Sequence, residues 1–348
     1  MLKTTVKIDR ILIIRTDRIG DVVLSLPVVT ALRRKYPDAY IAMLVSPAVR
    51  EIVEDHPDLD EVLLDNGGGL SDFFKLVRKI RLKKFDVAVL LHPTFPLAFA
   101  LAIAGIPWRI GTGYRFYSIL FNKRIFEHRK DSLRHEVDYN LSLASVLGAD
   151  VSKVDFNFPV LQEALWKIEK LFKEIKITDE KPIVVLHPGS RGSALDWPVS
   201  YFAQLANRLV RKSHAQVIVT GGHGEEKVVS EVLKNTSGEV RGIAGRLNLK
   251  ELAALLKKAD LVVANSTGPL HIGVAVGTEV IGFYPPLVPA SVRRWGPYRR
   301  RMSTFVPDLP ECKKCIKSKC PYWNCMKLIS VDDVWKRADE KLKGKNLA

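Results

Sequence analysis

The feature that most constrains the fold is a strict alternation of short apolar runs with longer segments of helical spacing. The strand-like runs of the first half are 11–14, 40–45, 62–64 and 87–91. Helical patterns such as 22–35 and 70–82 separate them. A helix between two strands carries the chain back, so that the second strand runs parallel to the first. This alternation therefore predicts a parallel sheet covered by helices on both faces.

The alternation weakens after Asp150 and then restarts. The strands expected in the second half are 183–186, 216–220, 241–244, 261–264 and 279–284, with helices at 199–211, 225–233, 249–257 and 269–276. The 348 residues also exceed what one hydrophobic core usually covers. We therefore expect an α/β protein of two tandem Rossmann-like, doubly wound domains with a cleft between them. The expected bounds are 1–155, a linker at 156–181, 182–330 and a C-terminal helix at 331–348.

The composition favours a globular protein with an anionic partner. Hydrophobic residues make up 47% of the chain, and 54 basic against 38 acidic residues leave a formal charge of +16. The first apolar run is too short for a signal peptide or a membrane span, so we expect a cytoplasmic protein. Residues 95–106 are apolar, but Pro96 and Gly105 favour a buried helix over a spanning one, and a position on a membrane surface stays open.

Three junctions between a strand and a helix carry chemically active residues. The first reads RTDRIGDVVLSLP from Arg15 to Pro27, with Gly20 suited to a tight turn. Asp21 either caps the following helix or complements its dipole, or it acts as a general base. The second junction, HPGSRGS, places Ser190 and Arg191 after a strand, which suits a phosphate cradle or an ordinary loop.

The third junction, NSTGPLH at 265–271, has the strongest signal. Ser266 and Thr267 are of the type that caps helices, and Gly268 permits close approach of a ligand to the backbone. A helix that begins here offers free amide groups to a phosphate. His271 falls in the first turn, where it faces either the ligand or the core.

The chain resembles the ADP-heptose:lipopolysaccharide heptosyltransferases, glycosyltransferase family nine. The resemblance rests on RTDRIGDVVLSLP followed in order by HPG at 187–189, WP at 197–198, TGG at 220–222 and NSTGPLH at 265–271. It covers most of the chain and implies a GT-B fold, in which the first domain binds the acceptor and the second the nucleotide sugar. It also implies that no metal or other cofactor takes part, and that the C-terminal helix packs back on the N-terminal domain.

The resemblance assigns roles to individual residues. It implies inverting transfer of a heptose from ADP-heptose to the lipopolysaccharide inner core, with Asp21 as general base. The donor and its phosphates are expected to bind Ser190, Arg191, Ser266, Thr267, Gly268, His271 and Glu225. The acceptor is expected to bind Arg15, Asp17, Arg18 and Arg115, with the alternative that Arg15 holds Asp21 ionised.

Two departures from the family pattern limit this transfer of roles. Leu195 stands where many members have a lysine that contacts donor phosphate, so either another cation such as Arg191 substitutes or donor binding differs. Ser266 stands where several relatives have an aspartate. The choice between Glu225 and Glu226 for the nucleotide ribose stays open.

Two clusters mix basic and aromatic residues. Residues 108–135 hold seven Arg and Lys against two acidic residues, and 293–301 read RRWGPYRRR. They fit an anionic glycolipid acceptor and peripheral contact of a monomeric enzyme with the inner membrane leaflet. A nucleic-acid-binding protein explains the charge but not the phosphate loops. A dinucleotide oxidoreductase lacks its G-x-G-x-x-G, and transfer of another sugar to another acceptor stays open.

Four cysteines lie close together near the C-terminus. They are Cys312, Cys315, Cys320 and Cys325. Either two disulfides or a small structural zinc site would stabilise this segment.

Overall fold

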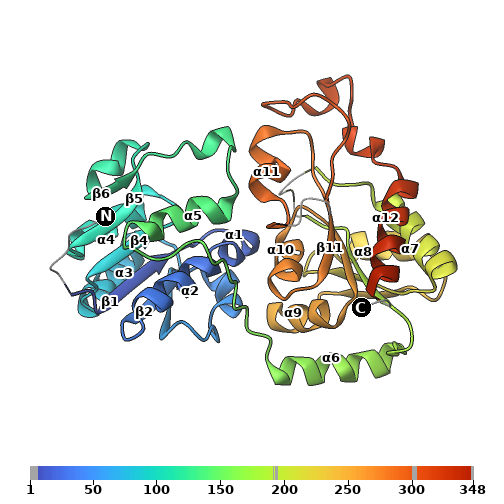
Figure 1. Ribbon diagram of the computed structural model, residues 1–348, viewed down its shortest axis with the longest axis horizontal. Helices are drawn as coiled ribbons and strands as arrows, with labels where there is room; N and C mark the ends of the chain where they lie inside the picture. Colours follow the sequence, from blue (N-terminus) through green and yellow to red (C-terminus); the bar gives the residue numbers. More distant parts are fainter. Residues whose placement is uncertain (1–6, 191, 193–194, 300–303, 346–348) are drawn as a thin grey trace. The chain divides into compact units, whose positions relative to one another are not determined.

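The chain folds into two compact units (Figure 1). The structure, a computed structural model, describes residues 7–190, 192, 195–299 and 304–345. One unit comprises the residues up to 159 except 131–133, and the other comprises those three residues and the chain from Val160 onward. Each unit contains one six-stranded sheet.

The sheet of the first unit is parallel throughout, as the alternation predicts, in the order β3-β2-β1-β4-β5-β6. Its strands are β1 (Arg10–Ile14), β2 (Tyr40–Val45), β3 (Glu61–Leu64), β4 (Val87–Leu90), β5 (Trp108–Thr112) and β6 (Lys123–Ile125). The last two were not expected, because they belong to the basic segment and lack a continuous apolar run. The central β1 is buried from Ile11 onward.

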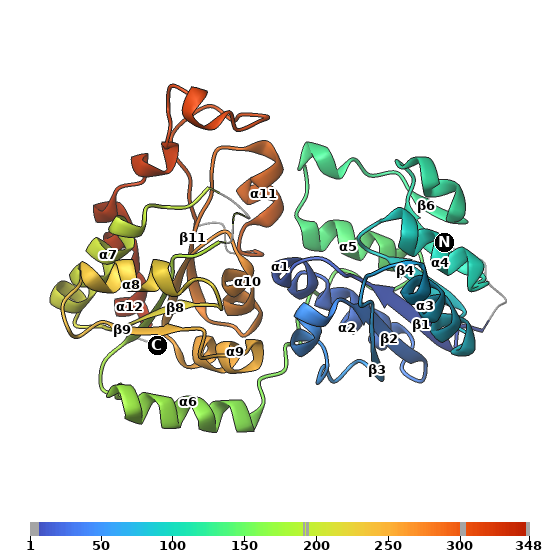
Figure 2. The same ribbon diagram turned by 180° about the vertical axis from the view of Figure 1, so that it is seen from behind.

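Helices cover both faces of this sheet (Figure 2). They are α1 (Ile19–Val23), α2 (Leu26–Lys35), α3 (Leu70–Leu82), α4 (Phe95–Ile103) and α5 (Glu136–Ser145), with 3-10 turns η1 (Pro47–Ile52), η2 (Phe116–Leu120) and η3 (Arg129–Asp131). One apolar cluster joins α3, α4 and η2 to one face, whereas α2 packs against α5. The single helix expected at 22–35 is divided, because Pro27 lacks an N–H and its ring would clash with the carbonyl of Val23.

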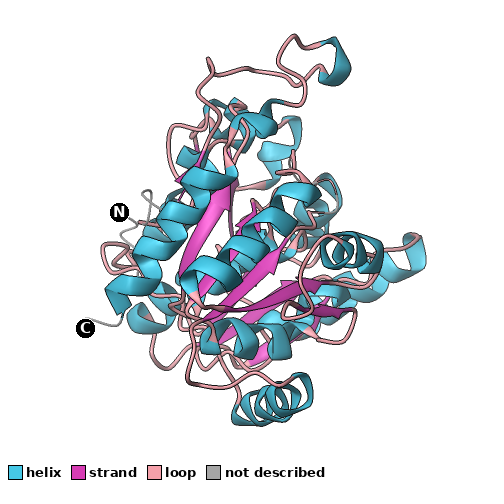
Figure 3. Ribbon diagram, turned by 90° about the vertical axis from the view of Figure 1, so that its right-hand side faces the viewer, coloured by secondary structure: helices cyan, strands magenta, loops and turns pink. Residues whose placement is uncertain are grey.

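The second unit repeats the architecture (Figure 3). Its parallel strands run in the order β12-β11-β10-β7-β8-β9. They are β7 (Ile183–His187), β8 (Gln216–Gly221), β9 (Arg241–Ala244), β10 (Leu261–Asn265), β11 (Glu279–Phe283) and the short β12 (Thr304–Phe305). The helices are α6 (Gln162–Ile175), α7 (Val199–Ser213), α8 (Glu226–Lys234), α9 (Leu249–Lys258), α10 (Gly268–Ala275), α11 (Val292–Trp295) and α12 (Val331–Lys345), with 3-10 turns η4 (Val288–Ala290), η6 (Lys317–Lys319) and η7 (Cys325–Leu328). Every strand and helix predicted here is present within a few residues of its expected bounds.

Two further helices pack within the second unit. The helix expected inside the linker, α6, packs on α9 and buries Ile168 and Phe172. The C-terminal helix α12 packs on α7. Asp332 accepts a hydrogen bond from Arg208 at 2.7 Å, and Trp335 donates one to Ser213 at 3.1 Å. The apolar face of α12 therefore completes the core around α7.

Candidate active site

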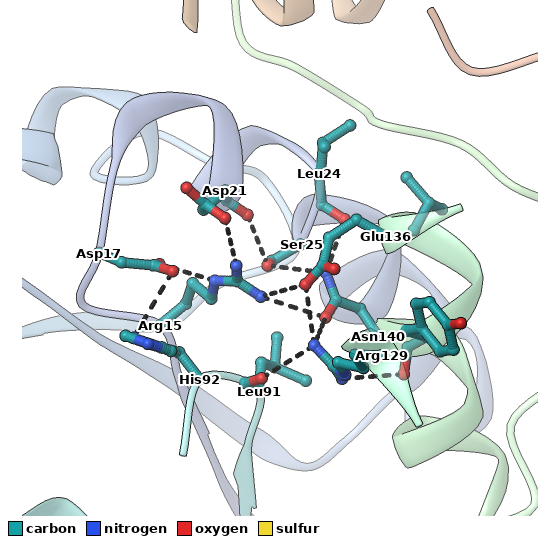
Figure 4. A network of polar contacts seen from close by, with 12 residues as sticks. Arg15, Asp17, Asp21, Leu24, Ser25, Leu91, His92, Arg129, Glu136 and Asn140 are labelled. Carbon is teal, nitrogen blue, oxygen red and sulfur yellow. Dashed lines mark hydrogen bonds and ion pairs between the residues drawn. The ribbon is translucent and has the colours of Figure 1, made fainter. Parts of the chain in front are cut away.

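A buried arginine organises the carboxyl end of β1 (Figure 4). The side chain of Arg15 is only 3% exposed and donates hydrogen bonds in three directions. Its Nε reaches Asp17 Oδ1 at 2.7 Å, its Nη2 reaches Asp21 Oδ1 at 2.5 Å, and its Nη1 reaches Glu136 Oε1 at 3.0 Å. The turn between β1 and α1 thus places the carboxylates of Asp17 and Asp21 against one guanidinium.

Helix α5 supplies the other side of this cluster. Glu136 and Asn140 are one helical turn apart and therefore lie on the same face. Asn140 accepts from Arg15 at 3.2 Å and donates to the carbonyl of Leu24 at 3.2 Å. Arg129 donates to Glu136 Oε1 at 2.8 Å, so the 1% exposed Glu136 carboxylate contacts two guanidinium groups. This network fixes the position of Arg15 and, through it, of Asp21.

The cluster changes the proton affinity of its members. Burial raises the pKa of Asp21 to about 6, and the nearby Asp17 and Glu136 carboxylates add to the rise, while Arg15 opposes it. Burial lowers the pKa of Arg15, but the three carboxylates outweigh burial and raise it above its ordinary value. Asp21 is therefore ionised at neutral pH and still more basic than an ordinary aspartate, which suits a general base.

Asp21 lies where it complements the dipole of α1 rather than capping the helix. The N-cap of α1 is Arg18, and Asp21 lies in the first turn with its carboxylate bound to Arg15. The partly exposed Asp17 also lies 3.5 Å from His92 Nδ1, which follows β4. The side chain of Arg18 is exposed, and Arg115 is exposed at the start of η2, close enough to Tyr117 to affect its pKa. Arg15, Asp17 and Asp21 thus form one cluster, which Arg115 does not join in the contacts described.

Sequence reasoning missed three members of this cluster. Glu136, Asn140 and Arg129 are more than 100 residues from Arg15 along the chain. The sequence signal that could have found them is the spacing of Glu136 and Asn140, four residues apart among the apolar residues of a helix. A buried charged side chain requires a partner, so this spacing indicates a buried cation nearby.

Replacing Asp17 with asparagine is expected to move the acid limb of kcat/KM below its position near pH 6. The substitution removes a like charge beside Asp21 but keeps an oxygen that accepts from Arg15, so the pKa of Asp21 falls by roughly one unit. The pH profile of kcat/KM measures this shift. The exposed Asp38→Asn is the matched control and should leave the limb in place, while an unmoved limb in Asp17→Asn would count against Asp21 as the titrating base.

In the second unit, the loops after β7 and β8 are joined by polar contacts. Thr220 Oγ1 lies 3.0 Å from His187 Nδ1, and the Glu225 carboxylate accepts from the N–H of Gly222 at 2.7 Å. A Cβ at Gly189 would overlap Glu225 Oε1, so only glycine fits there without displacing this carboxylate. Glu225 is buried and is bound to the loops, whereas Glu226 is exposed and accepts from Gly224 at 3.1 Å.

The helix α10 begins at the third junction. Thr267 is its N-cap, and the Thr267 hydroxyl oxygen is buried without a hydrogen-bond partner among the described residues. The first-turn amides and Gly268 provide the N-terminus that binds anions in other proteins. Ser266 interacts with the buried Tyr284 hydroxyl, and His271 is buried. Of the predicted donor residues, Thr267 and Gly268 therefore lie at the N-terminus of a helix.

Asn265 connects this helix to the loop after β7. Its side chain accepts from the N–H of Trp197 at 2.9 Å and donates to the carbonyl of Pro188 at 2.7 Å. Ser190 is buried in that loop, and the partly buried Asp196 follows it with a pKa raised by burial. Leu195 packs against the core. Arg191, the predicted substitute for the family lysine, lies outside the described residues.

The remaining predictions concern the C-terminal segment and the membrane. All four cysteines are free thiols, so the disulfide alternative is not realised. In the part of the chain that the structure describes, no group of three or more His, Cys, Asp or Glu side chains is arranged to hold a metal ion. Of the RRWGPYRRR segment, 300 and 301 lie outside the described residues. Within the same described ranges, no helix combines the length and apolar character needed to cross a bilayer.

The two parallel Rossmann-like units, with polar residues in the loops at the carboxyl ends of their strands, have the GT-B fold. The chain belongs to glycosyltransferase family 9 (heptosyltransferase), whose sequence profile matches residues 73–325. It is 28% identical over 298 residues to a putative glycosyltransferase of Haemophilus influenzae, covering 83% of this chain and 86% of the relative.

Solved structures agree in fold. A family 9 glycosyl transferase from Veillonella parvula matches with a TM-score of 0.83 and 23% identity over 97% of both chains. The Escherichia coli ADP-heptose LPS heptosyltransferase II matches with a TM-score of 0.78 and 21% identity, covering 97% of this chain and 99% of that one. At these identities the likeness establishes the fold, and the enzyme class follows from the family.

Proposed function

We propose that this chain is an inverting heptosyltransferase that transfers a heptose from ADP-heptose to the lipopolysaccharide inner core. The single observation that carries the proposal is the partly buried carboxylate of Asp21, held by Arg15 after the carboxyl end of β1 with a pKa of about 6. A sugar hydroxyl is a weak nucleophile near neutral pH and needs such a base.

The proposed reaction is a single displacement. An acceptor hydroxyl transfers its proton to the Asp21 carboxylate while its oxygen bonds to the anomeric carbon of the donor. The bond from that carbon to the diphosphate breaks, and ADP leaves with the electron pair, so the configuration is inverted. Arg15 keeps its own proton throughout, since its pKa is raised, and its positive charge stabilises the nearby carboxylates.

The second unit is proposed to bind the donor. The buried Thr267 hydroxyl and the amides at the start of α10 are suited to the diphosphate, whose charge grows as ADP leaves. Ser190 and Arg191 are proposed to act from the loop after β7. The Escherichia coli structure is of an ADP-heptose enzyme, which supports ADP as the nucleotide here. Glu225 is proposed to order the two loops that flank the nucleotide, and Ser266 and His271 to line the same site.

The proposed acceptor is an anionic glycolipid, with Arg15, Asp17, Arg18 and Arg115 on its side of the reaction. We propose a monomeric, cytoplasmic enzyme in peripheral contact with the inner membrane leaflet, in keeping with the charge of +16. The second candidate function is transfer from another nucleotide sugar to another glycan or lipid, because pocket shape decides such specificity.

A donor screen tests the proposal. Purified protein is incubated with a deacylated inner-core acceptor and with ADP-heptose, ADP-glucose or UDP-glucose. ADP-heptose is expected to give kcat/KM at least about 100-fold above the other two donors. A wrong sugar or base would leave polar groups of the binding site without hydrogen-bond partners. Equal or better transfer from another donor would favour the second candidate. Binding of duplex DNA with no sugar transfer would instead favour a nucleic-acid-binding protein.

A further inference from the structure

Helix α4 has an unusual surface for a helix that covers a sheet. Its sequence, FPLAFALAI, contains no charged residue. One face is buried through Leu97, Ala98 and Leu101. The opposite face is also apolar, with Phe95 44% and Phe99 40% exposed. An outer helix normally presents polar residues to water, so the exposed apolar face requires an explanation.

Exposed aromatic rings continue from this face onto its neighbours. Phe99 stacks on Phe73 of α3 at a centroid distance of 6.0 Å and on Phe95 at 5.6 Å. Phe95 contacts Phe116 of η2 at 5.7 Å, and Phe73 contacts Phe74 at 5.5 Å. The rings form one row across α3, α4 and η2, which we call the aromatic strip: Phe73, Phe74, Phe95, Phe99, Phe116 and Tyr117.

The ends of the strip are the most exposed. Phe116 is 84% and Phe74 is 58% exposed, and the exposed Leu70 and Ile119 add apolar surface on α3 and η2. Such large apolar side chains in water cost free energy unless a partner covers them. The ring contacts join α3, α4 and η2, so the strip is a continuous surface rather than scattered residues.

Basic side chains flank the strip. The exposed Lys75, Arg78 and Lys79 lie on α3, and Arg115 precedes Phe116. Residues 70–135, which include all three elements, contain thirteen Arg and Lys against four Asp and Glu. Aromatic residues bordered by cations are typical of surfaces that rest in the interface of an anionic bilayer. A second copy of this chain is a poorer partner, because a symmetric contact would bring these like charges together.

We propose that the aromatic strip and its basic flank form a docking surface for an anionic phospholipid bilayer. The exposed phenylalanines insert at the headgroup level, and the α3 cations contact lipid phosphates. The proposal rests on the proposed function only in that a lipid-borne acceptor would be met at such a bilayer. The family assignment and the base Asp21 do not depend on it.

Vesicle binding by the full chain tests the proposal without donor or acceptor. Vesicles of phosphatidylcholine with phosphatidylglycerol are expected to bind the protein in a flotation assay, and vesicles of phosphatidylcholine alone much less. Phe74→Ser/Phe116→Ser is expected to weaken binding by roughly tenfold or more, because two exposed rings no longer enter the bilayer. Arg78→Gln/Lys79→Gln is expected to weaken binding to the anionic vesicles alone by roughly tenfold.

Controls separate docking from folding, catalysis and other partners. Trp166→Ser removes a 62% exposed apolar side chain of α6 and should leave vesicle binding unchanged. The phenylalanine double variant should also keep its thermal stability and its transfer to a deacylated, soluble acceptor. The proposal is overturned if the wild type ignores anionic vesicles or if the double variant binds them equally well. Two further results would overturn it. If the wild type is a dimer that the phenylalanine double variant separates into monomers, the strip binds a second copy of the chain. If the wild type binds duplex DNA and the double variant does not, the strip binds nucleic acid.

Discussion

Replacing Asp21 with asparagine is expected to lower kcat/KM for sugar transfer by roughly 10²–10⁴-fold, the usual contribution of a general base. The amide keeps the shape of the side chain but takes up no proton from the acceptor hydroxyl. Arg15 retains Asp17 and Glu136 as partners, so the first unit should stay folded. On one preparation, steady-state kinetics measure kcat/KM, circular dichroism measures folding, and titration with ADP measures nucleotide binding.

The pH dependence provides a second measurement on the same variant. The folded-state pKa of Asp21 is raised, so its contribution to stability is present at low pH and is lost as the pH rises through about 6. The activity of the wild type should rise over the same range, because the base must be ionised. Asp21→Asn should lack both transitions. Near-normal turnover, or an acid limb that survives near pH 6, would rule out Asp21 as the base.

Replacing Arg15 with glutamine is expected to cost about 3–5 kcal/mol of unfolding free energy, the usual result of breaking a buried ion pair. The variant leaves the buried Glu136 with Arg129 as its remaining cationic contact in the network and leaves Asp21 without its own. The pKa of Asp21 should rise above 6, because Arg15 lowers it in the wild type. Less of the base is then ionised at neutral pH, so activity falls there and recovers at higher pH.

Urea denaturation and the pH profile of kcat/KM check the two effects. Arg34→Gln is the matched control, since Arg34 pairs with Asp155 on an exposed surface and should cost at most about 1 kcal/mol. If Arg15→Gln does not fold, Arg15→Lys keeps the charge but not the fork of donors and should show the same shifts on a smaller scale. An acid limb that moves to lower pH in either variant would contradict the role assigned to Arg15.

Most of the second unit could be predicted from the sequence. Runs such as IVVL at 183–186 and LVVA at 261–264 are buried strands in the structure, and the helix expected from Leu249 is α9. These segments have the length, residue types and spacing that local physical chemistry determines. The strands β5 and β6 escaped this reasoning, because their strand character comes from pairing beside β4 rather than from an apolar run.

The packing of the helices could not be predicted in the same way. Residues 331–342 have a clear helical pattern, yet nothing in that pattern identifies α7 as the helix on which they pack. The contact of Trp335 with Ser213 exists only once both helices are in place. The same holds for the aromatic strip, whose rings are distant in sequence and meet because α3, α4 and η2 cover one face of the sheet.

For the candidate site too, some features follow from the sequence and others only from the tertiary structure. The sequence by itself determined that the chain forms parallel α/β units and that Asp21 follows the first strand, because both depend on neighbouring residues. Only the tertiary structure decided that Glu136 and Asn140 of α5 contact Arg15 and that Asp21 is partly buried with a pKa of about 6. A pKa depends on burial and on the distances to other charges, and these exist only in the folded chain.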